Sequence, residues 1–246
     1  MKSLLLSSLS ILFIISNLAA CGGGGGGSGD DSSEIGEDSS LSSLQTLRIM
    51  PLGDSITQAE GGMASYRYWL WQFLISEGIS ADLVGGQSEV FQGRARFSDF
   101  DPDHQGHWDW HADQILANAD SFASTNQPDV VLLHIGTNDM RRNESIDSTL
   151  NEIAQIIETF RFHNPNVAIL LAQIIPSSVG NDRINVLNSR LPALVSSLQS
   201  ESSELILVDQ NTDFFLSSDS YDGVHPNQSG EQKIALRWLD ALRQIL

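Results

Sequence analysis

The sequence predicts a three-layer α/β/α sandwich built on a doubly wound sheet of five parallel strands. Short apolar runs, typical of strands buried on both faces, alternate with segments in which apolar residues recur every three or four positions. This alternation of strand and helix is the order expected of a parallel sheet. The 246 residues, 41% of them hydrophobic, are enough to form one full-sized core.

The elements follow one another along the chain without an internal repeat or a second folded domain. The predicted strands are Leu47–Leu52, Ala81–Gly85, Val130–Ile135, Val167–Ile174 and Leu205–Val208. The predicted helices are Tyr66–Glu77, Ala112–Phe122, Ile146–Phe162, Ile184–Gln199 and Gln228–Leu246. Because the strands run parallel, the loops that follow them open on one edge of the sheet, where several strand ends can meet a ligand.

The first 43 residues differ in composition from the rest. Residues 1–20 combine a positive start, a short apolar stretch and small residues before Cys21, which predicts a lipoprotein signal peptide with Cys21 lipidated. An ordinary secretory signal with an incidental cysteine is the alternative. Residues 21–43 contain six consecutive glycines and then mainly Ser, Asp and Glu, so we expect a flexible tether. The folded domain, 44–246, is then extracytoplasmic and lipid-anchored to a bacterial membrane, at the outer membrane or cell surface.

Charge and cysteine content narrow the possible partners. The chain has 13 Lys and Arg against 31 Asp and Glu, a net charge of −18. Binding to nucleic acid needs clustered basic side chains, so we expect no nucleic-acid partner. Cys21 is the only cysteine, so its lipidation leaves no disulfide and the core alone must stabilise the fold.

The first strand ends in the heptapeptide PLGDSIT, residues 51–57. In one interpretation the glycine supplies a tight turn, and Asp54 or Ser55 caps the helix that follows. In the other, Ser55 is a nucleophile held at the carboxyl end of a strand. This segment alone does not decide between them.

Two later strands are also followed by polar segments. LLHIGTND, residues 132–139, ends the third strand and places Asn138 at its tip, although a turn with a helix cap explains the same residues. YDGVHPNQSG, residues 221–230, follows the last strand. A single turn can aim Asp222 and His225 at one point, where the carboxylate fixes the imidazole tautomer. Together the segments offer a hydroxyl, a base with an orienting acid and an oxyanion donor, as acyl transfer requires.

The blocks GDSIT, GTND and DGVHP, in this order, resemble the SGNH hydrolases, the GDSL-type esterase superfamily, over about residues 47–244. The resemblance implies a flavodoxin-like sheet and an esterase that needs no cofactor. It also implies Ser55 as nucleophile, His225 as general base, Asp222 as orienting acid and Asn138 as oxyanion donor. The backbone N–H of Ser55 is implied as a second donor.

Within this superfamily, MPLGDSIT, SYRYWLWQFL, ADLVGG and HQGHWDWHADQI resemble secreted carbohydrate esterases, including acetylxylan esterases of family 3. Those proteins usually carry glycine as a third oxyanion donor where this chain has Asp109. We expect the Asp109 N–H to donate while its carboxylate turns away from Ser55, neutralised by Arg67, His107 or His111.

The segment 99–113 is rich in groups that bind metals. These are His104, His107 and His111, with Asp101, Asp103, Asp109 and Asp113. The alternating acids can suit calcium, but the spacing matches no zinc signature. We expect no metal and instead a substrate-binding loop to which Trp108 and Trp110 contribute aromatic faces, with Arg67 nearby. Either Trp is equally explained as core. His134 and His163 are expected to be structural.

We therefore expect a monomeric serine esterase that releases acyl groups, most simply acetyl, from carbohydrate. A lipid-directed esterase or lysophospholipase is the alternative enzyme, because the same triad serves many acyl groups and fold does not fix substrate. A non-catalytic, glycan-binding surface lipoprotein is the non-enzyme alternative.

Overall fold

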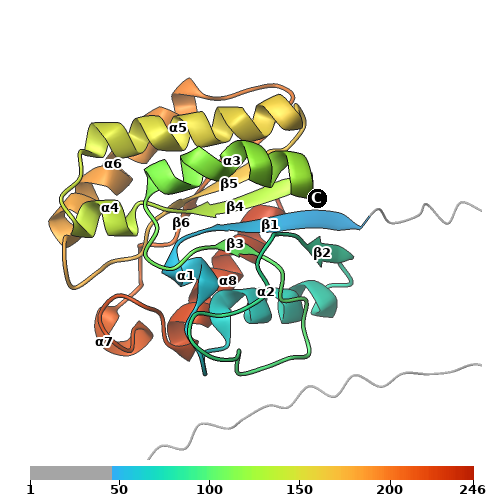
Figure 1. Ribbon diagram of the computed structural model, residues 1–246, viewed down its shortest axis with the longest axis vertical. Coiled ribbons are helices and arrows are strands. Elements are labelled where there is room, and N and C mark those ends of the chain that lie inside the picture. The colour runs from blue at the N-terminus through green and yellow to red at the C-terminus, as the bar shows by residue number, and fades with distance from the viewer. Residues whose placement is uncertain (1–45) are drawn as a thin grey trace, which may run out of the picture. The chain divides into compact units, whose positions relative to one another are not determined.

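The computed structural model describes residues 46–246, which form a parallel sheet between two layers of helices (Figure 1). The strands are β1 (Leu47–Gly53), β2 (Ala81–Leu83), β3 (Gln105–Gly106), β4 (Val130–His134), β5 (Ala168–Gln173) and β6 (Leu205–Asp209). Their order is β2-β1-β4-β5-β6, with β3 paired to the carboxyl end of β1. All these pairs are parallel, so the ends of β1 and β4 lie side by side at one edge.

The helices cover both faces of this sheet. They are α1 (Ser55–Gln58), α2 (Ser65–Ser76), α3 (Ala112–Asn126), α4 (Thr137–Arg141), α5 (Ile146–His163), α6 (Asn181–Ser197), α7 (Leu216–Asp219) and α8 (Gln228–Leu242). The buried faces of α3, α5 and α6 pack on one side, and those of α2 and α8 on the other. No helix within residues 46–246 is long and apolar enough to cross a membrane.

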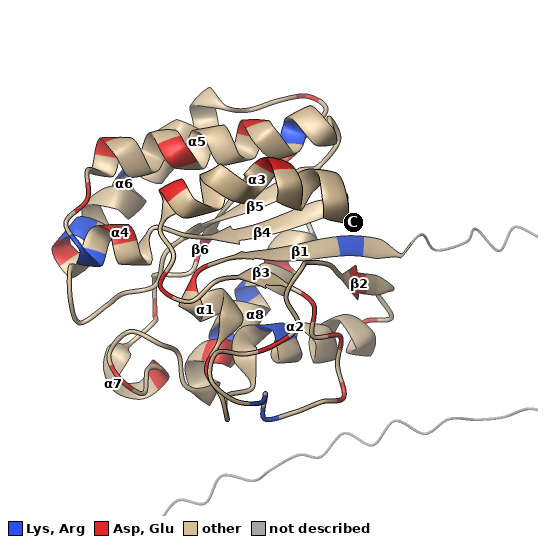
Figure 2. Ribbon diagram, viewed as in Figure 1, with Lys and Arg blue, Asp and Glu red and all other residues tan. Residues whose placement is uncertain are grey.

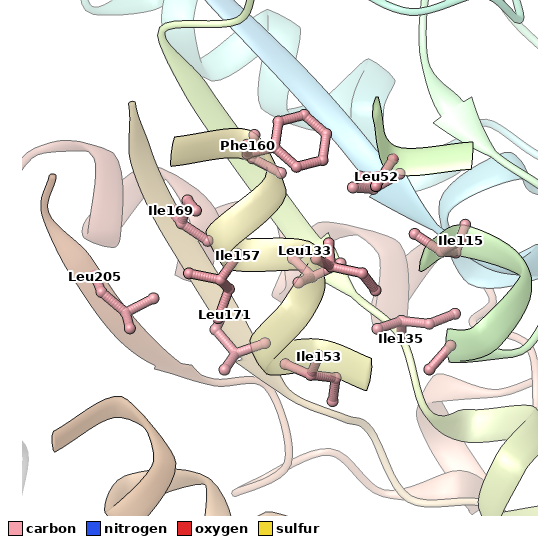
Figure 3. Close-up of a cluster of buried hydrophobic side chains, with 14 of the residues drawn as sticks. Leu52, Ile115, Leu133, Ile135, Ile153, Ile157, Phe160, Ile169, Leu171 and Leu205 are labelled. Carbon is pink, nitrogen blue, oxygen red and sulfur yellow. The ribbon is translucent and has the colours of Figure 1, made fainter. Parts of the chain in front are cut away.

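Two hydrophobic cores result from the alternation of side chains along the strands. On β1, Met50 and Leu52 face the core under α3, α5 and α6, whereas Ile49 faces the core under α2 and α8. Figure 3 shows the first core, in which Leu133 of β4 packs beside Ile157 of α5. Since strands buried on both faces need apolar residues at every position, their near-continuous apolar runs made them recognisable in the sequence.

The predicted fold class is confirmed, with one difference in the strand count. The sheet has six strands rather than five, because β3 adds a two-residue Gln-Gly pairing that carries no apolar signal. The second strand ends at Leu83 rather than Gly85, and the last helix at Leu242 rather than Leu246. The predicted signal peptide, the predicted lipidation of Cys21 and the predicted tether all fall outside the described residues.

Candidate active site

The β1–α1 turn holds Ser55 at the carboxyl edge of the sheet. A Cβ at Gly53 would lie 2.1 Å from the carbonyl oxygen of His134 on β4, so only glycine lets the two strands approach here. Asp54 is the N-cap of α1, and its carboxylate accepts a hydrogen bond of 2.9 Å from the N–H of Ile56. Complete burial raises the pKa of Asp54 to about 7. The turn and capping roles thus fall to Gly53 and Asp54, and leave Ser55 free to point elsewhere.

Ser55, His225 and Asp222 lie in one hydrogen-bonded line. Nε2 of His225 is 3.0 Å from Oγ of Ser55, and Nδ1 is 2.7 Å from Oδ2 of Asp222. The other carboxylate oxygen of Asp222 accepts from the N–H groups of Val224 and His225. Although burial opposes ionisation, these hydrogen bonds hold the pKa of Asp222 below its ordinary value. An ionised Asp222 fixes the proton on Nδ1, so Nε2 faces the serine hydroxyl as an acceptor.

Aromatic rings stack along this line. Trp108 lies nearly parallel to His225, with ring centroids 4.7 Å apart, and Phe91 stacks on Trp108 at 4.2 Å. Tyr221 is also nearly parallel to His225 at 5.8 Å, and its hydroxyl donates to Glu60. Sequence reasoning found Trp108 but missed Phe91, Tyr221 and Glu60. The position of Tyr221 directly before Asp222 was the one available signal.

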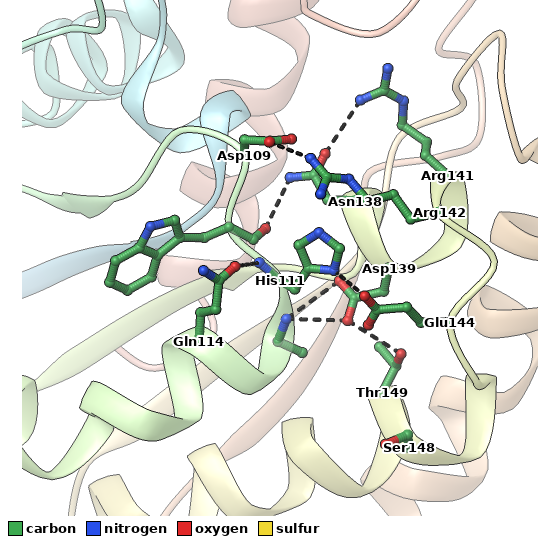
Figure 4. Close-up of polar contacts among 12 residues, drawn as sticks. Asp109, His111, Gln114, Asn138, Asp139, Arg141, Arg142, Glu144, Ser148 and Thr149 are labelled. Carbon is green, nitrogen blue, oxygen red and sulfur yellow. Dashed lines mark hydrogen bonds and ion pairs between the residues drawn. The ribbon is translucent and has the colours of Figure 1, made fainter.

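Two of the predicted oxyanion donors, Asp109 and Asn138, lie where the loop before α3 meets α4 (Figure 4). The side-chain amide of Asn138 donates to the carbonyl of Trp110 at 2.9 Å, which orients it and leaves its second N–H. The N–H groups of Trp108 and Trp110 both donate within the protein, whereas that of Asp109 has no acceptor in residues 46–246. The backbone N–H of Ser55 lies in the first turn of α1, where N–H groups lack intrahelical acceptors.

The partner of the Asp109 carboxylate differs from the expected ones. Asp109 adopts a left-handed φ of 64°, a conformation in which glycine is usual, and its carboxylate pairs with Arg142. Arg142 follows α4 and did not figure in the sequence argument. The expectation of Arg67, His107 or His111 as the counter-ion is therefore wrong, because a cation from the segment bearing Asn138 lies closer.

Arg67 is also unavailable to substrate, which corrects its predicted binding role. It is only 1% exposed, and its guanidinium donates to the carbonyls of Thr57, Gln58 and Pro102. Burial lowers the pKa of Arg67 to about 10. Arg67 thus ties the end of α1 to the 99–103 loop rather than facing the cleft.

The histidines and aspartates of segment 99–113 do not gather into one cluster. His104 is fully buried and hydrogen-bonded to the backbone of Glu89 and Gly106. His107 contacts Gln105 and stacks on Trp110, whose ring packs against the core rather than standing in the cleft, and burial lowers the pKa of His107 to about 4.

Two of the other histidines occupy structural positions. Burial lowers the pKa of His134, in β4, to about 4. His163 ends α5 and pairs with Asp120 at 2.7 Å. Both placements agree with the structural roles expected from the sequence.

A small pocket lies beside Ser55. It is lined by Ser55, Ile56, Ala59, Glu60, Met63, Tyr221, His225, Pro226 and Glu231. Glu231 of α8 is 1% exposed and accepts hydrogen bonds from the Ser65 N–H and the Trp69 indole. Burial raises the pKa of Glu231 to about 7. The wall of the pocket thus includes two glutamates, Glu60 and Glu231.

Comparison with known proteins places these features in a family. Residues 52–233 match the model of the GDSL-like lipase/acylhydrolase family. A multidomain esterase of Ruminococcus flavefaciens is 28% identical over 229 residues, which cover 83% of this chain but only 29% of that protein. The chain thus spans less than a third of that relative.

Two solved esterase structures match this chain over almost their whole length. A mutant acetyl esterase with acetate ion is 30% identical, with a TM-score of 0.74, over 81% of this chain and 98% of that one. A family 3 carbohydrate esterase of Clostridium thermocellum is 32% identical, with a TM-score of 0.70, over 82% and 99%.

Proposed function

The chain belongs to the GDSL-like lipase/acylhydrolase family and is a carboxylic ester hydrolase, and from this we propose that it removes acetyl groups from carbohydrate by serine catalysis. One observation carries the proposal: His225 bridges the hydroxyl of Ser55 and the carboxylate of Asp222 at 3.0 and 2.7 Å. A base in hydrogen-bond contact with both nucleophile and orienting acid is the arrangement that activates serine for attack.

The proposed reaction has two stages. Ser55 Oγ bonds to the ester carbonyl carbon as its proton passes to Nε2 of His225, and the negative carbonyl oxygen is held by Ser55 N–H, Asp109 N–H and Asn138. The C–O bond to the sugar then breaks, and the departing oxygen takes the proton from His225. Water next gives a proton to His225, attacks the acyl-enzyme and releases acetate, and Ser55 Oγ recovers its proton.

A short acyl group fits the pocket beside Ser55 best. Glu60 and Glu231 both stand in the wall of that pocket. A long alkyl chain laid against Glu60, which is only partly buried, would remove water from its carboxylate without a compensating hydrogen bond. The acetyl esterase and carbohydrate esterase among the similar structures support the same substrate class.

The aromatic rings beside His225 support the proposal of a sugar substrate. Tyr221 is 42% exposed, and Trp108 is half-buried next to the imidazole that must protonate the leaving oxygen. Flat apolar rings beside a wet, polar cleft suit the stacking of a sugar ring.

The decisive experiment measures acetate released from acetylated xylan, acetylated chitin fragments and peptidoglycan, together with rates on nitrophenyl esters of two to twelve carbons. We expect release from at least one polysaccharide and a fall in kcat/KM with chain length. Faster turnover of the long esters would favour the lipid-directed alternative. A phosphonate probe should label the wild type and Ser76→Ala, an exposed serine at the end of α2, but not Ser55→Ala. Absence of labelling in the wild type would instead favour a glycan-binding protein.

We also propose that the domain is anchored outside the cytoplasm through lipid on Cys21. The support is the sequence of residues 1–43 alone. Cys21→Ser should move activity from the membrane fraction to the soluble fraction without changing kcat, since the catalytic groups all lie beyond residue 52. Activity that stays with the membrane in this variant would refute the lipid anchor.

A further inference from the structure

Three side chains of metal-binding types meet close to the segments that carry Asp109 and Asn138, although the sequence predicted no metal site. His111 comes from the residue before α3, Asp139 from α4 and Glu144 from the α4–α5 connection. One ligand atom of each lies within 4.8 Å of the other two (Figure 4). Among the three, only His111 belongs to the histidine-rich segment, so spacing along the chain could not reveal the cluster.

The imidazole of His111 has a buried nitrogen without a hydrogen bond. Its side chain is 8% exposed, and Nδ1 makes no hydrogen bond. Glu144 Oε1 is only 2.6 Å from Nδ1, but it lies out of line with the direction in which a ring N–H would donate. A buried ring nitrogen normally has a partner, because leaving it without one forfeits its solvation. Nδ1 is therefore a buried nitrogen that contacts one carboxylate, that of Glu144, without forming a hydrogen bond.

Hydrogen bonds from neighbouring groups orient the Asp139 carboxylate, as the residues around a metal site orient its ligands. Asp139 is fully buried, and its Oδ1 accepts from the N–H of Ala112 at 3.2 Å and the hydroxyl of Thr149 at 3.3 Å. Carboxylate oxygens have further lone pairs, so these bonds orient the group without using up its capacity. Hydrogen bonds of this kind fix ligand geometry in metal sites.

We infer that His111, Asp139 and Glu144 bind one divalent first-row transition ion of the zinc class. One imidazole nitrogen and two carboxylate oxygens match the ligand types of zinc, whereas calcium and magnesium prefer oxygen alone. Glu144 has a side chain 40% exposed, so the site is reachable from solvent and a water can complete the coordination.

The ion would join the two segments that carry oxyanion donors. His111 lies two residues after Asp109, and Asp139 directly follows Asn138. The same segments are already linked by the Asn138–Trp110 hydrogen bond and the Asp109–Arg142 pair. The metal is thus a structural clamp on the oxyanion loop. This effect on catalysis rests on the proposed function, but the binding of the metal does not.

The test is the binding of zinc chloride to the full chain after treatment with EDTA and dialysis. Calorimetry and elemental analysis of the dialysed protein should give one equivalent of zinc, and zinc should raise the unfolding temperature. His111→Ala and Glu144→Gln should each weaken zinc binding by about a hundredfold or more. His163→Ala is the matched control, because His163 pairs with a single carboxylate, Asp120, and should leave zinc affinity unchanged.

Glu144→Gln keeps the shape of a partly exposed side chain, so it decides the matter if His111→Ala does not fold. No zinc binding by the wild type would overturn the inference. Binding of one equivalent that survives Glu144→Gln unchanged would also overturn it, and so would binding lost in His163→Ala. Because none of these measurements uses an ester, the clamp and the esterase proposal can fail separately.

Discussion

Arg142 should matter to catalysis only through Asp109. Asp109 places a carboxylate on the residue whose N–H is proposed to face the oxyanion, and Arg142 neutralises that carboxylate. Arg142→Gln exposes the developing negative charge to an unpaired anion on the same loop. The variant should therefore lower kcat while leaving KM nearly unchanged, since the charge appears only in the transition state.

The size of this effect follows from the exposure of the pair. The relevant charges are the unpaired Asp109 carboxylate and the oxyanion of the transition state. As a scale, two unit charges about 4 Å apart interact by about 1 kcal/mol in water and about 4 kcal/mol near a protein surface. The side chains of Asp109 and Arg142 are 50% and 54% exposed, so solvent screening favours the lower figure. A loss of about 1 kcal/mol corresponds to about a fivefold fall in kcat. Salt at 0.5 M should reduce that fall, because exposed charges are screened.

Asp109→Gly, combined with Arg142→Gln, completes a double-mutant cycle. Glycine keeps the N–H, removes the anion and suits the left-handed φ of 64°. The single variant should have kcat within about twofold of wild type, and Asp109→Gly with Arg142→Gln should recover the rate lost in Arg142→Gln. Asp109→Ala, the matched control, keeps the backbone strain and should be about 1 kcal/mol less stable than the glycine variant in urea unfolding.

The assay is steady-state hydrolysis of nitrophenyl acetate by the wild type, the two single variants and the double variant at low and high salt. A double variant as slow as Arg142→Gln would show that the guanidinium acts directly, not by neutralising Asp109. A hundredfold loss in Asp109→Gly with the fold intact would show that the carboxylate itself is needed.

Three further outcomes are expected. Ser55→Ala and His225→Ala should each remove nearly all esterase activity with unchanged circular dichroism, and more than a few per cent residual turnover in Ser55→Ala would reject it as nucleophile. Asn138→Ala should lower kcat by roughly 10²–10³ with little change in KM, whereas a pure KM effect would make it a ground-state binding residue. Native Glu231 holds a proton up to about pH 7 that the unfolded chain releases near its ordinary pKa of 4.5, so stability should fall as pH rises between these values. Glu231→Gln should remove up to about 3 kcal/mol of this fall in urea unfolding at pH 5 and 8, and equal slopes in both proteins would contradict the assignment.

The sequence predicted those parts of the fold and site whose cause is local. Buried parallel strands show as apolar runs, and the turn after β1 shows as Gly-Asp-Ser, so the main strands and the position of Ser55 were found. The two-residue β3 was missed because its Gln and Gly carry neither pattern nor propensity for a strand. The clustering of Ser55, His225 and Asp222 follows from the topology, which brings loop ends 170 residues apart to one edge.

The missed features depend on contacts between distant segments that no local pattern encodes. Arg67 looked like a cleft residue, yet its guanidinium is taken up by carbonyls up to 35 residues away. Arg142 pairs with Asp109 across 33 residues. Charge and spacing do not say which acid a given arginine reaches, because loop conformation decides it.

The stacking around His225 also restricts the order of events at the site. The ring of Trp108 lies nearly parallel to the imidazole with centroids 4.7 Å apart, and together with the contacts to Ser55 and Asp222 it favours one orientation of the imidazole. In the proposed reaction the proton accepted at Nε2 also departs from Nε2, so the leaving alcohol and the incoming water use the same space in turn. Water then enters only after the leaving alcohol has gone. A second alcohol present at high concentration would compete with water for the space beside Nε2, and the acyl group would pass to that alcohol. The enzyme should therefore act as a transacylase in alcohol-rich solution.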